Sequence, residues 1–322
     1  MSPFLFSLNC VLPIFLIIVL GWALRQWKII IKPVADALNT IAFNVTLPLL
    51  LFRDIAIARL QDIFSPAIIL YAIAGTVLTF GITWFFAERF IKDRTAIGSF
   101  VQGSYRGNYA IIGLFLIVSI LGHTGKGALI TAFAVPLYNI LAVIILSVRS
   151  KNPQKVKLRE TLRNIIKNPL IIGIIAGLPF SIFEIPLFSH PQTGYIASTI
   201  DYLVNITNPI ALLAIGASIS VAKLKLGLPK ALTATMIKIV VSPAIFTGIA
   251  YWMREPLGFS GEDLLILFIM FGVPTAVASF IMASKMNNDE SLAANIILLS
   301  SVLSVLTLTF GIYLFKSAGL IQ

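Results

Sequence analysis

Apolar residues occur along this chain in long, nearly uninterrupted runs, not in the alternating patterns of a soluble fold. Ten such runs lie between charges, prolines and glycines, and each is close to the roughly 20 residues that an α-helix needs to cross a bilayer. They predict helices at about 9–27, 34–52, 65–87, 95–120, 127–148, 168–186, 196–222, 229–252, 262–284 and 291–315. The expected fold is an all-α integral membrane protein with ten transmembrane helices.

Composition supports a membrane protein and argues against a soluble one. Of 322 residues, 58% are hydrophobic and only 11% are charged, whereas a soluble domain keeps about a quarter of its residues charged. The net charge of +11 is high enough to suggest nucleic acid. The bases, however, lie between the apolar runs, where membrane orientation requires them. We therefore expect the chain to contact the lipid bilayer and to have no nucleic-acid partner.

Basic residues are divided unevenly between the two sets of loops. Loops that follow the odd-numbered spans carry seventeen Lys and Arg, whereas the other loops and the C-terminal tail carry five. Loops rich in Lys and Arg stay on the cytoplasmic side of a membrane. We therefore expect a multi-pass protein of the cell (inner or plasma) membrane with both termini extracytoplasmic.

The most basic segment, 149–167, divides the chain into two halves. The first half, 1–148, and the second, 168–322, are each expected to hold five spans, with 149–167 as a cytoplasmic linker. Because five is odd, the second half must enter the membrane in the opposite orientation. This predicts the inverted repeat of many secondary transporters.

A short motif recurs in the two halves. Asn44–Pro48 in the second span has the pattern N-x-T-x-P, and so does Asn205–Pro209 in the seventh. Proline removes a backbone donor and kinks a helix, so both helices are expected to be irregular at the motif. The residues predicted to form these breaks are Asn44, Pro48, Asn205, Asn208 and Pro209.

The fourth and ninth spans, which correspond in the two halves, are also interrupted. The fourth contains Gly103, Gly107 and Asn108, and the ninth contains Gly272 and Pro274. Broken backbone survives in a membrane only inside protein or beside a watery cavity, so matched breaks predict a midplane binding site. Helix N-termini at the breaks favour an anion. The alternative is that these glycines only let two helices pack closely.

Two cations lie inside predicted spans. Arg106 lies about eleven residues into the fourth span, where a charge is costly unless it is paired or hydrated. It is expected either to attract a carboxylate or to extend toward the headgroups. Lys238, in the eighth span, is either a second attraction for the anion or a structural contact with carbonyls or a carboxylate.

Other chemistry has little support. Acidic residues lie toward the ends of the predicted spans and both histidines lie in loops, so no proton carrier, metal site or cofactor is expected. Hydrolase, P-loop and zinc-peptidase motifs are missing, which argues against an enzyme. The membrane potential, worth about 2.3 kcal/mol per charge at 100 mV, is the simplest driving force. Sodium held by carbonyls and hydroxyls is the alternative.

Five short segments, in their order and spacing, resemble the auxin efflux carrier family, which includes the plant PIN exporters and bacterial relatives that carry malonate or other organic acids. The segments are Leu47–Phe52, Val135–Asn139, Lys167–Gly173, Asn208–Ser218 and Pro274–Lys285. The resemblance extends over nearly the whole chain.

The resemblance implies a scaffold of helices 1, 2, 6 and 7, a transport domain of helices 3–5 and 8–10, and elevator-type alternating access. Broken helices 4 and 9 would cross at the substrate site, with Asn108 and Pro274 matching the family's crossover asparagine and proline. Where PIN-type carriers have further prolines, this chain has Gly107 and residues near Leu114 and Phe280. The cytoplasmic loop is short, so auxin is not the expected substrate.

The leading hypothesis is a secondary transporter, most simply an efflux carrier, for a small organic carboxylate. Its alternatives are a sodium-coupled symporter and, in another class, a non-transporting membrane sensor or assembly subunit. A homodimer is an arrangement that the sequence leaves open. The candidate substrate-binding residues are Arg106, Gly107, Asn108, Tyr109, Asn139, Lys238, Pro274 and Thr275.

Overall fold

A computed structural model describes residues 2–57, 64–151, 167–188, 193–218 and 228–321. Regular structure in these ranges is helical, with short π-helical stretches labelled η, apart from one isolated β-bridge. The first half contains α1 (Pro3–Gln26), α2 (Lys32–Ile41), η1 (Ala42–Thr46), α3 (Leu47–Ile57), α5 (Pro66–Phe90), α6 (Arg94–Tyr105), η2 (Tyr109–Gly113), α7 (Leu114–Leu121) and α8 (Lys126–Arg149). Most of the predicted basic linker, 149–167, lies outside the described residues.

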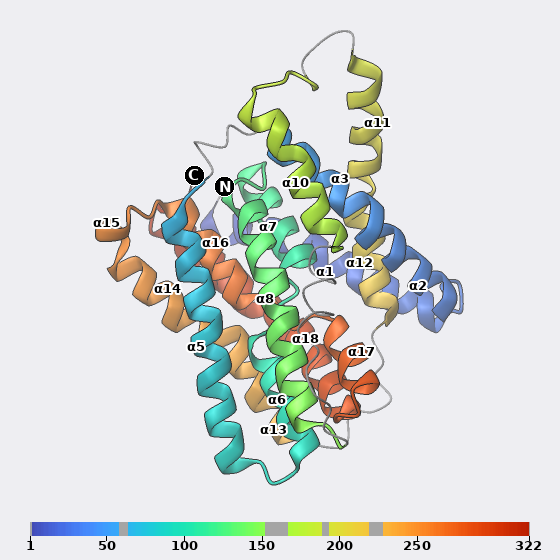
Figure 1. Ribbon diagram of the computed structural model, residues 1–322, viewed down its shortest axis with the longest axis vertical. Helices are drawn as coiled ribbons and strands as arrows, with labels where there is room; N and C mark the ends of the chain where they lie inside the picture. Colours follow the sequence, from blue (N-terminus) through green and yellow to red (C-terminus); the bar gives the residue numbers. More distant parts are fainter. Residues whose placement is uncertain (1, 58–63, 152–166, 189–192, 219–227, 322) are drawn as a thin grey trace.

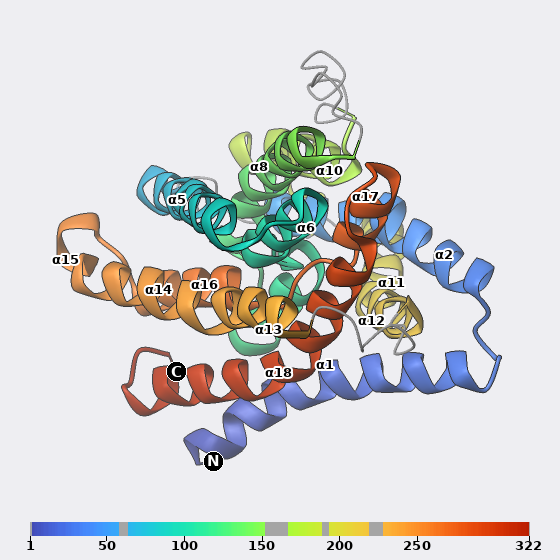
Figure 2. The same cartoon turned by 90° about the horizontal axis from the view of Figure 1, so that it is seen from below.

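The second half contains α10 (Pro169–Ile182), α11 (Gly194–Asn205), α12 (Thr207–Ser218), α13 (Leu228–Met236), η4 (Ile237–Val241), α14 (Ser242–Trp252), α15 (Arg254–Leu257), α16 (Gly261–Gly272), α17 (Ala278–Lys285) and α18 (Glu290–Ser317). The described helices form one bundle, in which segments of the two halves lie side by side (Figures 1 and 2).

Seven helical stretches of the described chain are long and apolar enough to cross a membrane: Pro3–Gln26, Lys32–Ile57, Pro66–Phe90, Lys126–Arg149, Gly194–Ser218, Leu228–Trp252 and Glu290–Ser317. The structure thus confirms an all-helical membrane protein. The other three predicted spans contain shorter helices, because the fourth and ninth are interrupted near their middle and the sixth ends at Ile182.

Side-chain caps set the start of several helices. The Asp93 carboxylate accepts the backbone N–H of Thr95 at 2.9 Å at the start of α6, and Asp289 accepts that of Leu292 at 2.9 Å at the start of α18. Burial acts to raise the pKa of the Asp93 carboxyl. Hydrogen bonds from the Thr95 side chain and backbone outweigh it, so this pKa is lowered. Each cap satisfies a donor that the helix itself leaves free.

Two helix pairs approach so closely that only glycine fits between them. A Cβ on Gly21 of α1 would overlap the carbonyl oxygen of Leu213 in α12. A Cβ on Gly177 of α10 would lie 2.8 Å from the carbonyl oxygen of Phe52 in α3. Figure 1 shows α10 beside α3, and Figure 2 shows α1 along the edge of the bundle near α12. Small residues at such contacts let helix backbones touch.

Several loops that are predicted to lie on the same side of the membrane are close to one another in the structure. Arg149 at the end of α8 forms an ion pair with Glu88 near the end of α5, and the backbone N–H of Asp289 donates to the carbonyl of Thr95 at 3.3 Å. The two chain termini lie near each other, away from these loops (Figure 1). The bundle therefore has one end formed by the loops after the third, fifth and ninth predicted spans.

Candidate functional site

The two interrupted segments, 106–108 and 273–277, meet inside the bundle. α6 ends at Tyr105 before the first break, and α16 ends at Gly272 before the second. Between the breaks, Gly107 and Thr275 form an antiparallel β-bridge. We call this meeting point the crossover. It joins two predicted spans that are far apart in the sequence.

Backbone groups freed by the two breaks satisfy each other. The N–H of Asn108 donates to the carbonyl of Pro274 at 2.7 Å, and the N–H of Ala276 donates to the carbonyl of Arg106 at 3.2 Å. Unpaired backbone groups are costly in a membrane, so this reciprocal pairing explains how both helices tolerate a break at the same place.

Thr275 holds the crossover together with its side chain and its backbone. Its hydroxyl donates to the carbonyl of Gly103 at 2.8 Å, and its N–H donates to the Ser300 hydroxyl at 3.1 Å. The side chain is buried. Thr275, predicted to line the substrate site, therefore supports the end of α6.

Gly107 is required by the space around it. A Cβ at this position would lie 2.9 Å from Cγ2 of Val273 and 3.1 Å from Nζ of Lys238. Any larger residue would push the two segments of the crossover apart or displace the lysine. Glycine here supplies both the break and the close approach.

Lys238 is fully buried in η4 and contacts the carbonyls at the end of α16. Its Nζ donates to the carbonyl of Phe271 at 2.5 Å, and the carbonyl of Met270 lies at 3.4 Å. Cations stabilise helix C-termini because these carry partial negative charge. Two roles were expected for Lys238, attraction of the anion and a structural contact. The observed geometry is a structural contact with carbonyls.

Arg106 is also buried, with 7% of its surface exposed, so it does not extend toward a headgroup. Its Nη2 donates to Oδ1 of Asn139 at 2.8 Å, and its Nη1 lies 2.8 Å from the sulfur of Met282. Ion pairs found among the described residues use other bases: Arg53 with Asp54 and Asp201, Lys126 with Asp263, and Arg149 with Glu88. The guanidinium thus has an amide and a thioether as its partners.

Asn108 and Tyr109, adjacent in sequence, have different surroundings. Asn108 precedes the first turn of η2 and makes no side-chain capping hydrogen bond, with 7% of its surface exposed. Tyr109 is fully buried, and its hydroxyl donates to the carbonyl of Gly127 at 3.2 Å. Tyr109 therefore packs against the start of α8. The Asn108 amide makes no such side-chain hydrogen bond within the part of the chain that the structure describes.

The repeated N-x-T-x-P motifs coincide with helix irregularities of different kinds. Asn44 lies in the π-helical stretch η1 and Pro48 follows in α3, but the second span continues without a break. The prediction of a broken helix is wrong there, because one π turn accommodates the missing proline N–H. In the seventh span α11 ends at Asn205 and α12 begins at Thr207, so Ile206 interrupts the helix. Asn208 and Pro209 lie in the first turn of α12.

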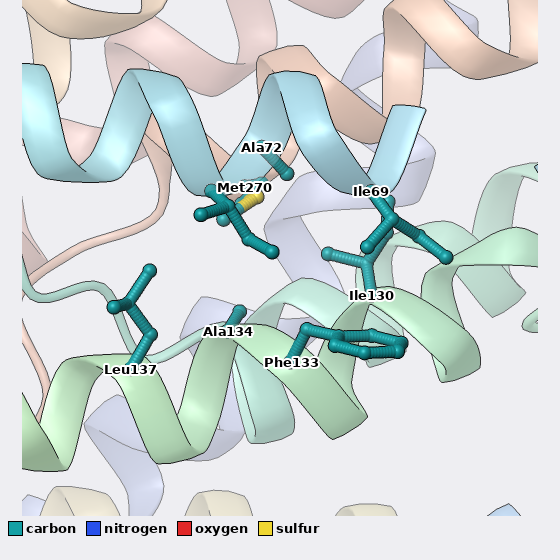
Figure 3. A pocket seen from close by; sticks show the side chains of 8 residues that line it. Ile69, Ala72, Ile130, Phe133, Ala134, Leu137 and Met270 are labelled. Carbon is teal, nitrogen blue, oxygen red and sulfur yellow. The ribbon is translucent and has the colours of Figure 1, made fainter. Parts of the chain in front are cut away.

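Two apolar cavities lie away from the crossover. One is a narrow gap between α5 and α8 that Met270 of α16 also lines (Figure 3), and it has no space for a water molecule. The other, of about 540 Å³, lies between α5 and the α13–η4 segment. Neither is lined by the candidate substrate-binding residues, so the polar groups of the crossover define the candidate site.

Three residues near the crossover were not predicted from the sequence. Met282 contacts the Arg106 guanidinium, Gln102 contacts the Met282 sulfur, and Ser279 lies three residues before Met282 on α17. Gln102 lies one helical turn before Arg106, a spacing that places both on one face and could have identified it. Met282 has no such signal, because methionine in a membrane helix ordinarily packs.

Comparison with known proteins identifies relatives over almost the full length. The profile of a family described as membrane transport protein matches residues 6–312. A "putative malonate transporter" of Rhizobium meliloti is 25% identical, with 96% of each chain aligned. Uncharacterized transporters of Methanothermobacter thermautotrophicus and Methanocaldococcus jannaschii are 21% identical, covering 95% and 94% of this chain and 97% and 96% of theirs.

Proposed function

Because the chain belongs to the membrane transport protein family, the family of the auxin efflux carriers, we propose that this membrane transporter is a secondary carrier of a small organic anion. The observation that carries the proposal is the surroundings of Arg106. This buried cation lies beside two broken helices, and the partners of its guanidinium are an amide and a thioether. A buried positive charge without a carboxylate is costly. An anionic substrate removes that cost when it binds.

The proposed site places each residue in a defined role. Arg106 attracts the carboxylate, Asn139 orients the guanidinium, and the Asn108 amide hydrogen-bonds the substrate. Thr275 and Lys238 keep the two broken ends in place through backbone carbonyls. The name of the Rhizobium relative makes malonate the first substrate to test.

We further propose ten helices in two inverted repeats, 1–148 and 168–322. Two matched contacts support this: Gly21 of the first predicted helix faces the carbonyl of Leu213 in the seventh, and Gly177 of the sixth faces that of Phe52 in the second. An internal symmetry that exchanges helices 1 and 6 and helices 2 and 7 converts one contact into the other. The basic loops would then face the cytoplasm and both termini the outside.

Alternating access follows from this arrangement. Helices 1, 2, 6 and 7 form a fixed scaffold, and helices 3–5 and 8–10, with the crossover, move across the membrane as an elevator. Acids are sparse in the spans, so export of an anion down the membrane potential needs no coupling ion. Each negative charge gains about 2.3 kcal/mol at 100 mV.

Radiolabelled malonate flux in proteoliposomes tests the function. A potential is imposed with potassium and valinomycin, with and without sodium. Arg106→Gln should reduce flux to the level of empty liposomes, because the amide keeps hydrogen-bonding capacity but removes the charge that attracts the anion. Arg89→Gln at the exposed end of α5 is the matched control and should retain wild-type flux.

The same assay separates the alternatives. Flux that responds to potential in sodium-free buffer supports the potential-driven carrier, whereas flux that requires sodium identifies a symporter. If no carboxylate in a panel of mono- and dicarboxylates is carried or bound, the anion proposal is wrong and the sensor or assembly role gains support.

A further inference from the structure

Two polar side chains contact the sulfur of Met282, and two more lie next to them in the structure or in the sequence. Gln102 and Arg106 reach it from α6, Asn139 contacts Arg106 from α8, and Ser279 lies one turn before Met282 on α17. We call these five residues the Met282 cluster. Two side-chain donors thus point at one thioether.

The thioether is a poor partner for the donors aimed at it. Arg106 Nη1 lies 2.8 Å from the Met282 sulfur, and Gln102 Nε2 lies 3.8 Å from the same atom. Sulfur in a thioether is only a weak acceptor, whereas guanidinium groups bind carboxylates strongly through paired hydrogen bonds. The sulfur occupies a position at which an anionic oxygen would bind far better.

Two further atoms of the cluster have no partner among the residues that the structure describes. They are Oε1 of Gln102 and Oγ of Ser279, and both side chains are at least 99% buried. Native proteins satisfy nearly all such groups. The Ser279 hydroxyl can donate to an anion, whereas Oε1 of Gln102 is an acceptor and requires a donor instead. Ser279 also lies in the first turn of α17, where the partial positive charge of the helix favours an anion.

The cluster is not uniformly buried. Asn139 and Met282 are half-buried, in contrast to Gln102 and Ser279. A ligand that enters past the half-buried residues therefore meets the methionine side chain before the buried polar atoms. Methionine has three rotatable bonds and adapts its shape at little cost.

We propose that Met282 is a displaceable placeholder for a substrate carboxylate. In the empty carrier its sulfur lies against Arg106, and on binding the side chain turns away while the carboxylate takes its place. Arg106 then donates to the carboxylate together with the Ser279 hydroxyl and Nε2 of Gln102. This inference rests on the proposed function and adds Gln102, Ser279 and Met282 to the residues that decide affinity.

Methionine methyl resonances provide a direct test in the full-length protein. The chain has six methionines, so a ¹³C-methyl-methionine spectrum in lipid nanodiscs is simple, and Met282→Leu assigns the resonance of interest. Saturating malonate should shift the Met282 methyl signal and leave that of Met253, at the end of α14, in place. A Met282 signal that does not move while malonate binds overturns the proposal.

Affinity gives a second readout. Met282→Leu keeps the volume but removes the competing sulfur, so malonate should bind several-fold more tightly. Met286→Leu, at the end of the same helix, is the matched control and should bind as the wild type does. Ser279→Ala should weaken binding about tenfold, the effect of one hydrogen bond to a charged group.

The results separate this inference from the function on which it depends. Malonate binding that is lost in Arg106→Gln but is not tightened in Met282→Leu retains the carrier and rejects the placeholder. Absence of binding by the wild type to every carboxylate tested rejects both. Tighter binding in Met282→Leu, with wild-type affinity in Met286→Leu, supports the displaced methionine.

Discussion

Two buried cations near the crossover have different surroundings and therefore different roles. Lys238 contacts the carbonyls of Phe271 and Met270, which end a helix and carry partial negative charge. Arg106 contacts the Asn139 amide and a thioether, neither of which carries a formal charge. The protein itself thus supplies acceptors for the lysine ammonium, whereas we propose that an external anion completes the contacts of the arginine guanidinium.

Replacing the lysine tests this division of roles. Lys238→Met keeps the length of the side chain but leaves the Phe271 carbonyl without its donor. We expect a loss of about 1–3 kcal/mol of stability, seen as a lower melting temperature in lipid or detergent, with the KM for malonate unchanged. Lys230→Met, at an exposed lysine of α13, should change neither quantity. A raised KM at normal melting temperature would instead make Lys238 part of the binding site.

At the scale of helices, glycine decides which pairs can touch. Gly216 of α12 faces the carbonyl oxygen of Ile18 in α1 so closely that a Cβ would overlap it, whereas Gly248 of α14 has no other atom within 4 Å of its Cβ position. Both positions are glycine, and both lie in apolar helices. Their importance differs because one lies in a contact and the other faces away from the bundle.

A pair of alanine substitutions measures that difference. Gly216→Ala must separate α1 from α12 and should destabilise the protein by about 1–3 kcal/mol. Gly248→Ala should be neutral or stabilise it by up to about 1 kcal/mol, because alanine favours a helix. Thermal unfolding followed by tryptophan fluorescence provides the comparison. Equal effects of the two variants would show that α1 and α12 are not held in close contact.

For the protein as a whole, the elevator proposal can be examined at a polar contact between the part proposed to move and the part proposed to stay fixed. The Thr124 hydroxyl, between α7 and α8, donates to Asp54 of α3 at 2.8 Å. Arg53, the neighbour of Asp54, pairs with Asp201 of α11 at 3.2 Å. Under the elevator proposal the first contact connects the transport domain to the scaffold, whereas the second lies within the scaffold.

Thiol cross-linking distinguishes these contacts in a functional carrier. The natural cysteine, Cys10, is buried, so engineered pairs can be linked with a short bis-thiol reagent. Linking Thr124→Cys to Asp54→Cys should stop malonate flux, and linking Arg53→Cys to Asp201→Cys should leave it largely intact. Cleavage of the linker should restore flux in the first pair. Flux that persists with the first pair fully linked contradicts an elevator motion between these parts.

Local properties of the chain account for most of what could be predicted. The length of an apolar run determines whether it can span a bilayer, and glycine or proline within it determines where the helix breaks. Seven stretches matched predicted spans, and the breaks at 106–108 and 273–277 lie where the residues indicated. The motif at Asn44 predicted a helix break that did not occur, because a π turn can accommodate a proline that would otherwise break the helix.

The order of residues along the chain is enough to predict an all-helical membrane protein of the transporter family in which two spans are interrupted. Three contacts became visible only in the folded protein: Gly107 pairs with Thr275, Lys238 contacts a carbonyl at a helix end, and Arg106 contacts the sulfur of Met282. The reason is physical. Helix formation and breakage depend on neighbouring residues, whereas the partner of a buried polar group depends on which distant segments the packing brings within a few ångströms of it.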